Sequence, residues 1–513
     1  MSEFKKYFNE KFFDKTIFKE KGENIDGLLS NEMSVICGDF YGIQKFIFEG
    51  LTTKHAAKVL RAKSAFVDIF TRVVAEFLCK KLKGKSLSTN AGKFEILVNS
   101  IVENKQIDEI QKELDNYFIK NFYGISGMSI VSVNCKKGDF EPGEPYKALR
   151  DKIQKAVETK KFSKFDLGKM DTSVLDYNKD ITNQTLCPIC NMRKISDGEN
   201  CKFCSMFKNL GSWLVGNKDE VSAKELNIDF CGDITIKLDE KIKSYVAKNN
   251  HEIMSFEELA KTDKDSTTPL NALGVLKADV DGMGNFIKGS DITNCFSSFD
   301  LFSKNIDAFF SLYVTKIIEK EFPNTYVVFA GGDDLFIIGE WKSALNLARK
   351  IKTEFENFVK DKETKDLSIS FGVAIAKPST PVKYLADITE ELLEKSKSLN
   401  GKNAISMFNL SVKWVNYLNT LEKLEKLKKL GGDDKTAFFY RLLDLCDMSA
   451  RIQDGDFTPK DSMWRSKLHY SIERNIKDSD KKELLELLNT QIEQYPKESK
   501  MVISEIIYTR REK

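Results

Sequence analysis

The order of predicted elements repeats in this chain of 513 residues, and this repeat constrains its fold more than any other feature. Apolar periodicity in the first third predicts a strand over 33–40, a helix over 56–82, a strand over 91–98, a helix over 107–118, a strand over 129–135 and a helix over 146–159. A second series predicts a strand over 274–280, a helix over 297–322, a hairpin over 326–339, a helix over 342–359, a strand over 367–376, a helix over 382–399 and a strand over 404–408. Both series indicate the βαββαβ order of a ferredoxin-like domain.

The two copies also align by sequence. The stretch that begins Asp39-Phe-Tyr-Gly matches the one that begins Asp279-Val-Asp-Gly. Fifty-four residues separate Asp39 from Lys93, and 54 also separate Asp279 from Asp333. Such equal spacing across a helix and two strands predicts a true internal repeat.

This alignment shows where the copies differ in charge. The first copy has Tyr41 where the second has Asp281, and it has Lys93 and Phe94 where the second has Asp333 and Asp334. We therefore expect the first copy to keep the scaffold without the acidic residues.

The hairpin over 326–339 carries the acidic pair at its tip, in the run Gly331-Gly332-Asp333-Asp334. Glycines give the turn backbone freedom, while adjacent carboxylates repel each other unless a cation lies nearby. One or two Mg²⁺ or Mn²⁺ ions would prefer such oxygen ligands and could clamp a phosphoryl group. The candidate catalytic residues are Asp279, Asp281, Asp333 and Asp334, with Asp279 and Asp333 as the best metal ligands; the alternative is a solvated acidic turn.

Four of the ten cysteines form a separate motif. Cys187, Cys190, Cys201 and Cys204 have the spacing C-x2-C…C-x2-C, which predicts a closed tetrahedral site for one structural zinc ion. A redox role is the alternative, but two paired motifs in one short loop argue against it.

Charge and hydropathy restrict the partners and the compartment. The formal net charge is only +3, from 80 basic and 77 acidic residues, which excludes a uniformly basic nucleic-acid binder. No apolar run reaches the roughly 18 residues that a membrane span needs, and no signal peptide is apparent. We expect a cytoplasmic protein with no membrane partner.

An ordered set of motifs resembles a known family. The motifs are Gly38-Asp-Phe-Tyr-Gly-Ile-Gln-Lys-Phe-Ile-Phe, Leu60-Arg-Ala-Lys-Ser, Ala91-Gly-Lys-Phe, Asp279-Val-Asp-Gly-Met-Gly and Gly331-Gly-Asp-Asp. In this order they resemble the large, polymerase/cyclase subunit of type III CRISPR–Cas effector complexes of the Csm or Cmr type. The resemblance implies two palm domains, of which the second joins ATP molecules into cyclic oligoadenylate messengers when the complex has captured target RNA.

The resemblance also implies ligands and partners. Lys397 and Lys402 resemble triphosphate-binding lysines, and Gly331, Gly332 and Val280 are implied in nucleotide binding. The implied partners are guide RNA and target RNA, held through the backbone, tag-binding and small subunits of the complex. Many relatives carry an N-terminal His-Asp nuclease domain; the three histidines here, His55, His251 and His469, are scattered, so we expect no such nuclease.

The expected fold is α+β, with two tandem ferredoxin-like palm domains, a zinc-binding insertion and a C-terminal helical bundle. The expected domains are residues 1–160 (degenerate first palm), 161–265 (zinc-binding linker), 266–408 (catalytic second palm) and 409–513 (bundle). From residue 409 onward we expect only helices, four in number, over 414–430, 435–452, 463–475 and 481–494. A second Gly-Gly-Asp-Asp, over 431–434, follows a helical run and is predicted to be a structural helix end.

Three alternatives to cyclic oligoadenylate synthesis stay open. The chain could adenylate a different acceptor, or it could be a non-catalytic scaffold subunit of the ribonucleoprotein. A stand-alone diguanylate-type cyclase is the third, since Gly-Gly-Asp-Asp-Leu-Phe resembles that motif; the degenerate first copy and the cysteine motif argue against it.

Overall fold

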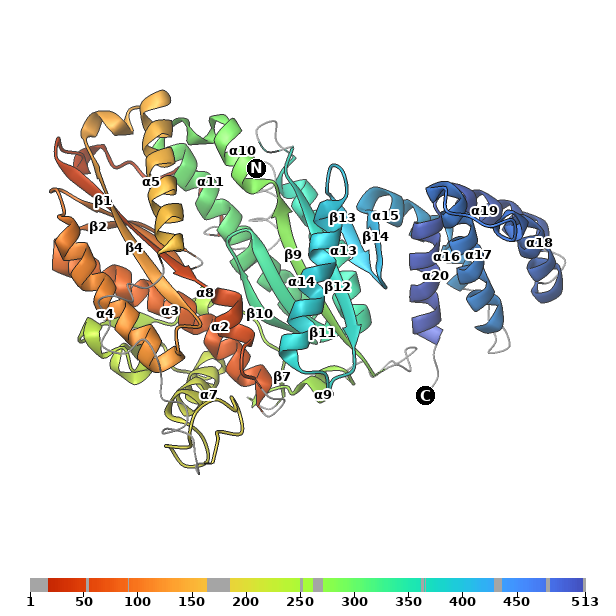
Figure 1. Cartoon of the computed structure of the whole chain (residues 1–513), viewed down its shortest axis with the longest axis horizontal. Coiled ribbons are helices and arrows are strands. Elements are labelled where there is room, and N and C mark those ends of the chain that lie inside the picture. Colours follow the sequence, from red (N-terminus) through yellow and green to blue (C-terminus); the bar gives the residue numbers. More distant parts are fainter. Residues whose placement is uncertain are drawn as a thin grey trace.

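The computed structural model describes residues 17–51, 55–90, 92–163, 185–249, 252–261, 271–360, 364, 366–428, 436–476 and 480–510. Figure 1 shows the first sheet and its helices in red and orange, a linker in yellow and light green, a second sheet in green and cyan, and a helical region in blue.

The first sheet has four strands in the order β2-β3-β1-β4. They are β1 (Met33–Tyr41), β2 (Lys85–Asn90), β3 (Lys93–Val98) and β4 (Gly127–Cys135). Helices α3 (Ala56–Leu82) and α4 (Asn104–Phe122) cover one face, and α5 (Glu144–Phe162) covers the other. Side chains alternate along β1, so Ile36 and Phe40 contact the core beneath α3 and α4, whereas Val35 and Cys37 contact the core beneath α5.

The second sheet has six strands in the order β10-β11-β9-β12-β13-β14. They are β9 (Leu273–Asp281), β10 (Thr325–Gly331), β11 (Asp334–Glu340), β12 (Ser368–Ala376), β13 (Ala404–Met407) and β14 (Leu410–Lys413). One face contacts α11 (Phe296–Ala308), the π-helical turn η7 (Phe309–Val314), α12 (Thr315–Glu321) and α13 (Trp341–Phe358). The other face contacts α14 (Val382–Ser398) and the helix α3 of the first sheet.

Alternation along β9 decides which side chains reach the α14 face. Leu276 and Ala278 lie in the core beneath α11 and α13, whereas Leu273 and Val275 lie in the core that α3 and α14 share. A period of two therefore places Lys277, Asp279 and Asp281 on the α14 face as well. Glycine at 372 permits this packing, because a Cβ there would lie 2.5 Å from backbone atoms of α14.

A linker joins the two sheets and packs against both. It contains α7 (Lys202–Val215), β5 (Glu220–Ser222), β6 (Thr235–Lys237), α8 (Glu240–Lys243), β7 (Lys248–Asn249), β8 (Glu252–Ile253) and α9 (Phe256–Leu259). Its buried apolar residues belong to the same core as α3 and the α14 face of the second sheet. Tyr326 of β10 donates a hydrogen bond to the Ala57 carbonyl of α3, which ties the two sheets together directly.

The C-terminal helices pack against the second sheet. They are α15 (Trp414–Lys423), α16 (Glu425–Lys428), α17 (Thr436–Asp454), α18 (Trp464–Asn475), α19 (Lys481–Gln494) and α20 (Pro496–Arg510). Arg349 of α13 pairs with Glu505 of α20, and Tyr417 of α15 donates to the same carboxylate at 3.0 Å. This buried triad fixes the helical region against α13.

The mixed α+β class and the helical C-terminal region are confirmed. The expectation of helix alone after residue 408 is wrong, because Leu410–Lys413 forms β14 and pairs with β13. The expectation of four C-terminal helices is also wrong, because α20 was missed. Strand β2 escaped the sequence analysis as well.

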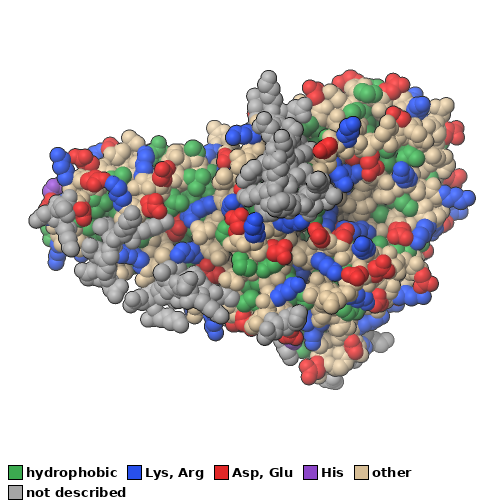
Figure 2. Space-filling model, turned by 180° about the vertical axis from the view of Figure 1, so that it is seen from behind, with side chains coloured by type: hydrophobic (Ala, Val, Ile, Leu, Met, Phe, Trp, Pro, Cys, Tyr) green, Lys and Arg blue, Asp and Glu red, His purple; other side chains and the backbone are tan. Residues whose placement is uncertain are grey.

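Acidic and basic side chains intermingle over the face seen in Figure 2, in keeping with the net charge of +3. No helix among the residues described is long and apolar enough to cross a bilayer.

Candidate active site

The acidic hairpin of the second sheet places its carboxylates beside β9. Asp334 is the cross-strand partner of Asp279, and the backbone amide of Val280 donates to the carbonyl of Asp333 at 3.0 Å. Gly332 has φ +66°, a left-handed conformation that glycine adopts without strain. Asp279 and Asp334 therefore lie next to each other on the α14 face, and Asp333 lies in the turn.

Two lysines compensate this negative charge. Lys397 near the end of α14 pairs with Asp279 at 2.6 Å, and Lys277, two residues before Asp279 on β9, pairs with Glu390. Burial raises the pKa of Asp279 even though Lys397 opposes the shift, and burial lowers the pKa of Lys277. Lys277 was missed by the sequence analysis, although its position two residues before Asp279 on one strand was an available signal.

Asp281 has a different environment from the other acids. Its Oδ2 accepts hydrogen bonds from Ser368 Oγ at 2.7 Å, Ser370 Oγ at 3.0 Å and the Asn403 amide at 3.0 Å. Its Oδ1 is buried and has no hydrogen-bond partner among the residues described. Asp281 thus anchors the turn after α14 through one oxygen and keeps the other available.

The negative charge around Asp334 is only partly compensated by the two lysines. Burial and the neighbouring charges of Asp333 and Asp279 raise the pKa of Asp334 to about 7, against the opposing effect of Lys277 and Lys397. Together with the unpartnered Oδ1 of Asp281, this shortage of positive charge fits a divalent cation held by carboxylates. In the described part of the chain these carboxylates do not converge to within 4.8 Å of one another in a set of three.

The pKa of Asp334 leads to a stability prediction. An aspartate in an unfolded chain has a pKa of about 3.9, so the folded protein binds this proton more tightly and loses stability as pH rises from about 4 to about 7. We therefore expect metal-free Asp334→Asn to melt a few degrees above the unsubstituted protein at pH 8, with a smaller difference at pH 5.5. Differential scanning fluorimetry measures this, with exposed Asp108→Asn as control. Added Mn²⁺ should stabilise the unsubstituted protein more than the variant, and an unchanged melting temperature of Asp334→Asn at pH 8 would contradict the raised pKa.

The strand register corrects the alignment of the two copies by one residue. Asp39 pairs across the strands with Lys93, whereas Asp279 pairs with Asp334. Likewise the amide of Phe40 bonds to the carbonyl of Gly92, whereas that of Val280 bonds to the carbonyl of Asp333. Gly92 and Lys93 therefore correspond to Asp333 and Asp334. The alignment of Lys93 with Asp333 is wrong, because the second copy has one more residue than the first between its first strand and its hairpin.

The first copy nevertheless keeps half of the charge arrangement. Asp39 pairs with Lys161 at the end of α5 at 2.6 Å, just as Asp279 pairs with Lys397 near the end of α14. Helices α5 and α14 cover corresponding faces of their sheets. Lys161 could have been found by extending the repeat to the last helix of each copy.

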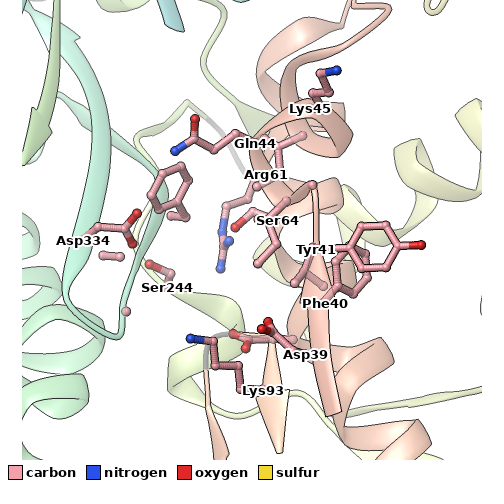
Figure 3. A pocket seen from close by; sticks show the side chains of 18 of the residues that line it. Asp39, Phe40, Tyr41, Gln44, Lys45, Arg61, Ser64, Lys93, Ser244 and Asp334 are labelled. Carbon is pink, nitrogen blue, oxygen red and sulfur yellow. The ribbon is translucent and has the colours of Figure 1, made fainter. Parts of the chain in front are cut away.

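A cavity of about 1120 Å³ lies between the two copies. The second sheet lines the cavity with Gly331 and Asp334. The first copy lines it with Asp39, Lys93, Lys161, Arg61 and Ser64. Figure 3 shows Asp334 on one wall facing the labelled side chains of the first copy, with Asp39 and Lys93 side by side below. Lys93 of the first copy and Asp334 of the second copy thus occupy equivalent strand positions on opposite sides of one cavity.

The remaining predicted ligands lie around this site. Gly331 lines the cavity, and Val280 contributes its backbone to the turn while its side chain is buried in the core beneath α11. Lys402 lies in the turn between α14 and β13, where Lys413 donates to its carbonyl. The structure therefore brings together Asp279, Asp334 and Lys397, and places Asp281 and the Lys402 turn beside them.

The four cysteines of the second motif come together as predicted. Their sulfurs lie within 4.8 Å of one another, and all four residues are buried. The Cys201 sulfur accepts a hydrogen bond from the Cys204 amide at 3.4 Å, at the first turn of α7. A buried set of four thiol ligands is compatible with zinc.

Two further predictions concern histidine and the second Gly-Gly-Asp-Asp run. His55 precedes α3 and His469 lies on α18, in different parts of the molecule. His251 and residues 431–434 lie outside the residues that the structure describes.

Two protein-family models match the chain. A model described as Cas10/Cmr2, second palm domain, matches residues 272–406, and one described as Csm1 subunit domain B matches residues 32–179. The first range contains the strands β9 to β12 and all but the last residue of β13, and the second contains the whole first sheet.

Curated relatives match more of the chain. A protein of Methanocaldococcus jannaschii is 26% identical, covering 80% of this chain and 63% of its own length. A protein of Streptococcus thermophilus is 24% identical, covering 72% of this chain and 53% of its own length. Both are named CRISPR system single-strand-specific deoxyribonuclease Cas10/Csm1 (subtype III-A). The chain thus spans less than two thirds of the length of these relatives.

Solved structures share the fold over nearly the whole chain. A Csm1–Csm4 cassette in complex with cA4 has a TM-score of 0.69 at 20% identity, covering 95% of this chain and 71% of its counterpart. The same kind of cassette with one ATP has a TM-score of 0.68 at 19% identity, covering 94% and 70%.

Proposed function

Because this chain belongs to the Cas10/Csm1 family of CRISPR subtype III-A large subunits, we propose that it joins ATP molecules into cyclic oligoadenylates at the cavity between its two sheets. The two sheets are, on this proposal, tandem palm domains, the first degenerate (within residues 1–160) and the second catalytic (within 266–408). The linker within 161–265 carries the zinc site, and residues 409–513 form the helical partner-binding region.

The observation that carries the proposal is that each copy has an equivalent aspartate–lysine ion pair and that both copies line the same cavity. Asp279 with Lys397 and Asp39 with Lys161 are related by the internal repeat, and both copies line the same space. The second copy adds Asp333 and Asp334, whereas the first has Lys93 at the position of Asp334. A metal-bound donor nucleotide fits the second copy, and an acceptor nucleotide whose charge is met by lysine fits the first.

The proposed reaction is a nucleotidyl transfer. The 3′-hydroxyl of the acceptor releases its proton to solvent as its oxygen attacks the α-phosphorus of the donor. A new P–O bond forms, the bond to the β-phosphate breaks, and pyrophosphate leaves. Asp279 and Asp333, supported by Asp281 and Asp334, would hold one or two Mg²⁺ or Mn²⁺ ions, which when bound supply positive charge against the triphosphate. Lys397 and Lys402 would compensate the negative charge of the leaving pyrophosphate. Lys397 would then pair with a phosphate oxygen in place of the Asp279 carboxylate. Gly331, Gly332 and Val280 would bring backbone atoms close to the nucleotide.

The proposed setting is a ribonucleoprotein. The solved relatives are Csm1–Csm4 assemblies, which supports a role beside a Csm4-like tag-binding subunit. We extend this to backbone and small subunits that hold guide RNA and target RNA.

We further propose that this 513-residue chain contributes no His-Asp nuclease centre of its own. Hydrolysis by such a centre requires clustered imidazoles and carboxylates around its metals. Of the three histidines, the two that the structure describes lie far apart in the fold, His55 before α3 and His469 on α18.

Product analysis tests the function. The assembled, target-bound complex is incubated with Mg²⁺ and ATP, alone and with other hydroxyl acceptors, and products are identified by mass spectrometry. We expect pyrophosphate and rings of AMP units from ATP alone. An adenylated acceptor would replace the ring proposal, a guanylate product would favour the diguanylate alternative, and no product would favour the scaffold. In a parallel reaction with single-stranded DNA and Mn²⁺, cleavage that survives Asp333→Ala would reveal a separate nuclease centre.

A further inference from the structure

One half-buried lysine of the linker connects the hairpin turns of both copies. Lys241 of α8 donates to Asp307 Oδ2 at 2.7 Å and to Asn90 Oδ1 at 3.1 Å. Asp307 in turn accepts the backbone amide of Gly332 through Oδ1 at 3.0 Å. The Lys241 and Asp307 side chains are only 14% and 10% exposed, so this is a partly desolvated ion pair.

The two ends of this connection, Asn90 and Gly332, lie within one residue of equivalent positions in the repeat. Asn90 is the cross-strand partner of Lys93 in the first copy, and Gly331, next to Gly332, is the cross-strand partner of Asp334 in the second. The connection therefore joins the residue opposite Lys93 to the turn that carries Asp333. No motif in the sequence indicated Lys241 or Asp307, since the residues come from separate elements.

Both members are held in place by other contacts. Asp239 caps α8 by accepting the Ile242 amide at 3.0 Å, and Arg72 of α3 pairs with Asp239 at 2.6 Å. Arg61 of α3 donates to the carbonyl of Ile242. Asp307 lies at the last turn of α11, immediately before the π-helical turn, where Ser311 Oγ donates to its carbonyl at 2.7 Å. Helix α8 is thus fixed to the first copy and Asp307 to the second.

We propose that Lys241 and Asp307 are positioning residues that set the distance and orientation between the two hairpin turns, and so between acceptor and donor nucleotide. This role rests on the proposed nucleotidyl transfer. Attack by the 3′-oxygen needs in-line alignment with the α-phosphorus, and a misplacement of about 1 Å can cost roughly a hundredfold in rate. Asp307 acts on the metal-bearing turn through Gly332, and Lys241 ties Asp307 to the first copy.

The test separates alignment from nucleotide contact. In the assembled, target-bound complex we expect Lys241→Met to lower kcat roughly tenfold or more while KM for ATP stays within about twofold. Lys241→Arg should restore most of kcat, because guanidinium can still pair with Asp307. Asp307→Asn, which keeps an acceptor for Gly332, should resemble Lys241→Met, and the double variant should be no worse than either. The matched control is Lys243→Met on the same helix, whose side chain pairs with exposed Asp219 at 3.5 Å.

A second measurement does not depend on the reaction. Hydrogen exchange of residues 325–340 in the full chain should accelerate in Lys241→Met and Asp307→Asn and stay unchanged in Lys243→Met. Unchanged exchange with unchanged kcat would overturn the positioning role, and a raised KM at unchanged kcat would make Lys241 a nucleotide contact instead. If the unsubstituted complex makes no product, the proposed function fails and exchange alone decides whether the two residues hold the turn.

Discussion

The Asp333→Ala, Asp334→Ala double variant should lose ATP-dependent product formation by about a thousandfold or more, because metal-borne charge stabilisation is worth several kcal/mol and each 1.4 kcal/mol is tenfold in rate. The variant should still fold, since the first copy forms the same hairpin with Gly92 and Lys93 at these positions. Removing Asp334 also relieves a buried carboxyl whose pKa is raised to about 7, so the metal-free variant should not be less stable. Pyrophosphate release by the assembled, target-bound complex is the measurement.

The chain contains its own matched control for this experiment. Alanine at both aspartates of the second Gly-Gly-Asp-Asp run, Asp433 and Asp434, removes the same residues from the same four-letter sequence. We expect that control to keep full activity. A correctly assembled Asp333→Ala, Asp334→Ala complex that still makes product would refute the assignment of the acids. Failure of that variant to assemble would instead favour the scaffold alternative.

The second large effect concerns zinc. Freshly purified protein should contain about one zinc ion per chain, and Cys190→Ser should remove it and lower stability by several kcal/mol, since binding free energies of about 10–16 kcal/mol at such sites are folding free energy. The cluster lies in the same continuous core as α3 and α4. Arg193, next to the cluster, donates to the carbonyl of Asn121 at 2.7 Å and lies over the rings of Phe122 and Phe203. Loss of zinc should therefore destabilise the first sheet before it changes the chemistry of the second.

Metal analysis and thermal melting check this prediction. Cys295→Ser, at a half-buried cysteine outside the cluster, is the control and should keep the zinc and the melting temperature. Freshly purified protein without zinc would refute the site. Full stability of Cys190→Ser with zinc absent would show that the cysteines hold no structural metal.

Helices and strands with one apolar face were predictable, because the spacing of their apolar residues in the sequence matches the period of the element. Helix α3 begins and ends where the apolar spacing predicts, at Ala56 and Leu82. Strand β2 is a polar edge strand, Lys-Ser-Leu-Ser-Thr-Asn, with an irregularity between Ser86 and Ser88, so it shows no alternation. Helix α20 is buried around most of its circumference from Met501 to Ile507, which removes the amphipathic signal.

The candidate site was predictable only where its residues lie close together in the sequence. Asp279, Asp333, Asp334 and the four cysteines stand in short motifs, and the structure brings each group together. The correspondence of Lys93 with Asp334 follows from the hydrogen-bond register of the strands. Counting residues along the sequence gave an alignment that was off by one residue. The pair of Lys241 and Asp307 arises from a tertiary contact between α8 and the last turn of α11, and no spacing rule reaches across 66 residues.

The most direct measurement of the central claim is product analysis with ATP mixed with 3′-deoxy-ATP, which can donate its α-phosphate but has no 3′-hydroxyl to attack another. If an acceptor in the first copy attacks a donor in the second, the assembled complex should release pyrophosphate and accumulate short linear products that end in 3′-deoxyadenosine, while rings decline in proportion. Rings formed at an undiminished rate, or products of unchanged length at every ratio of the two nucleotides, would contradict transfer from a 3′-hydroxyl across this cavity.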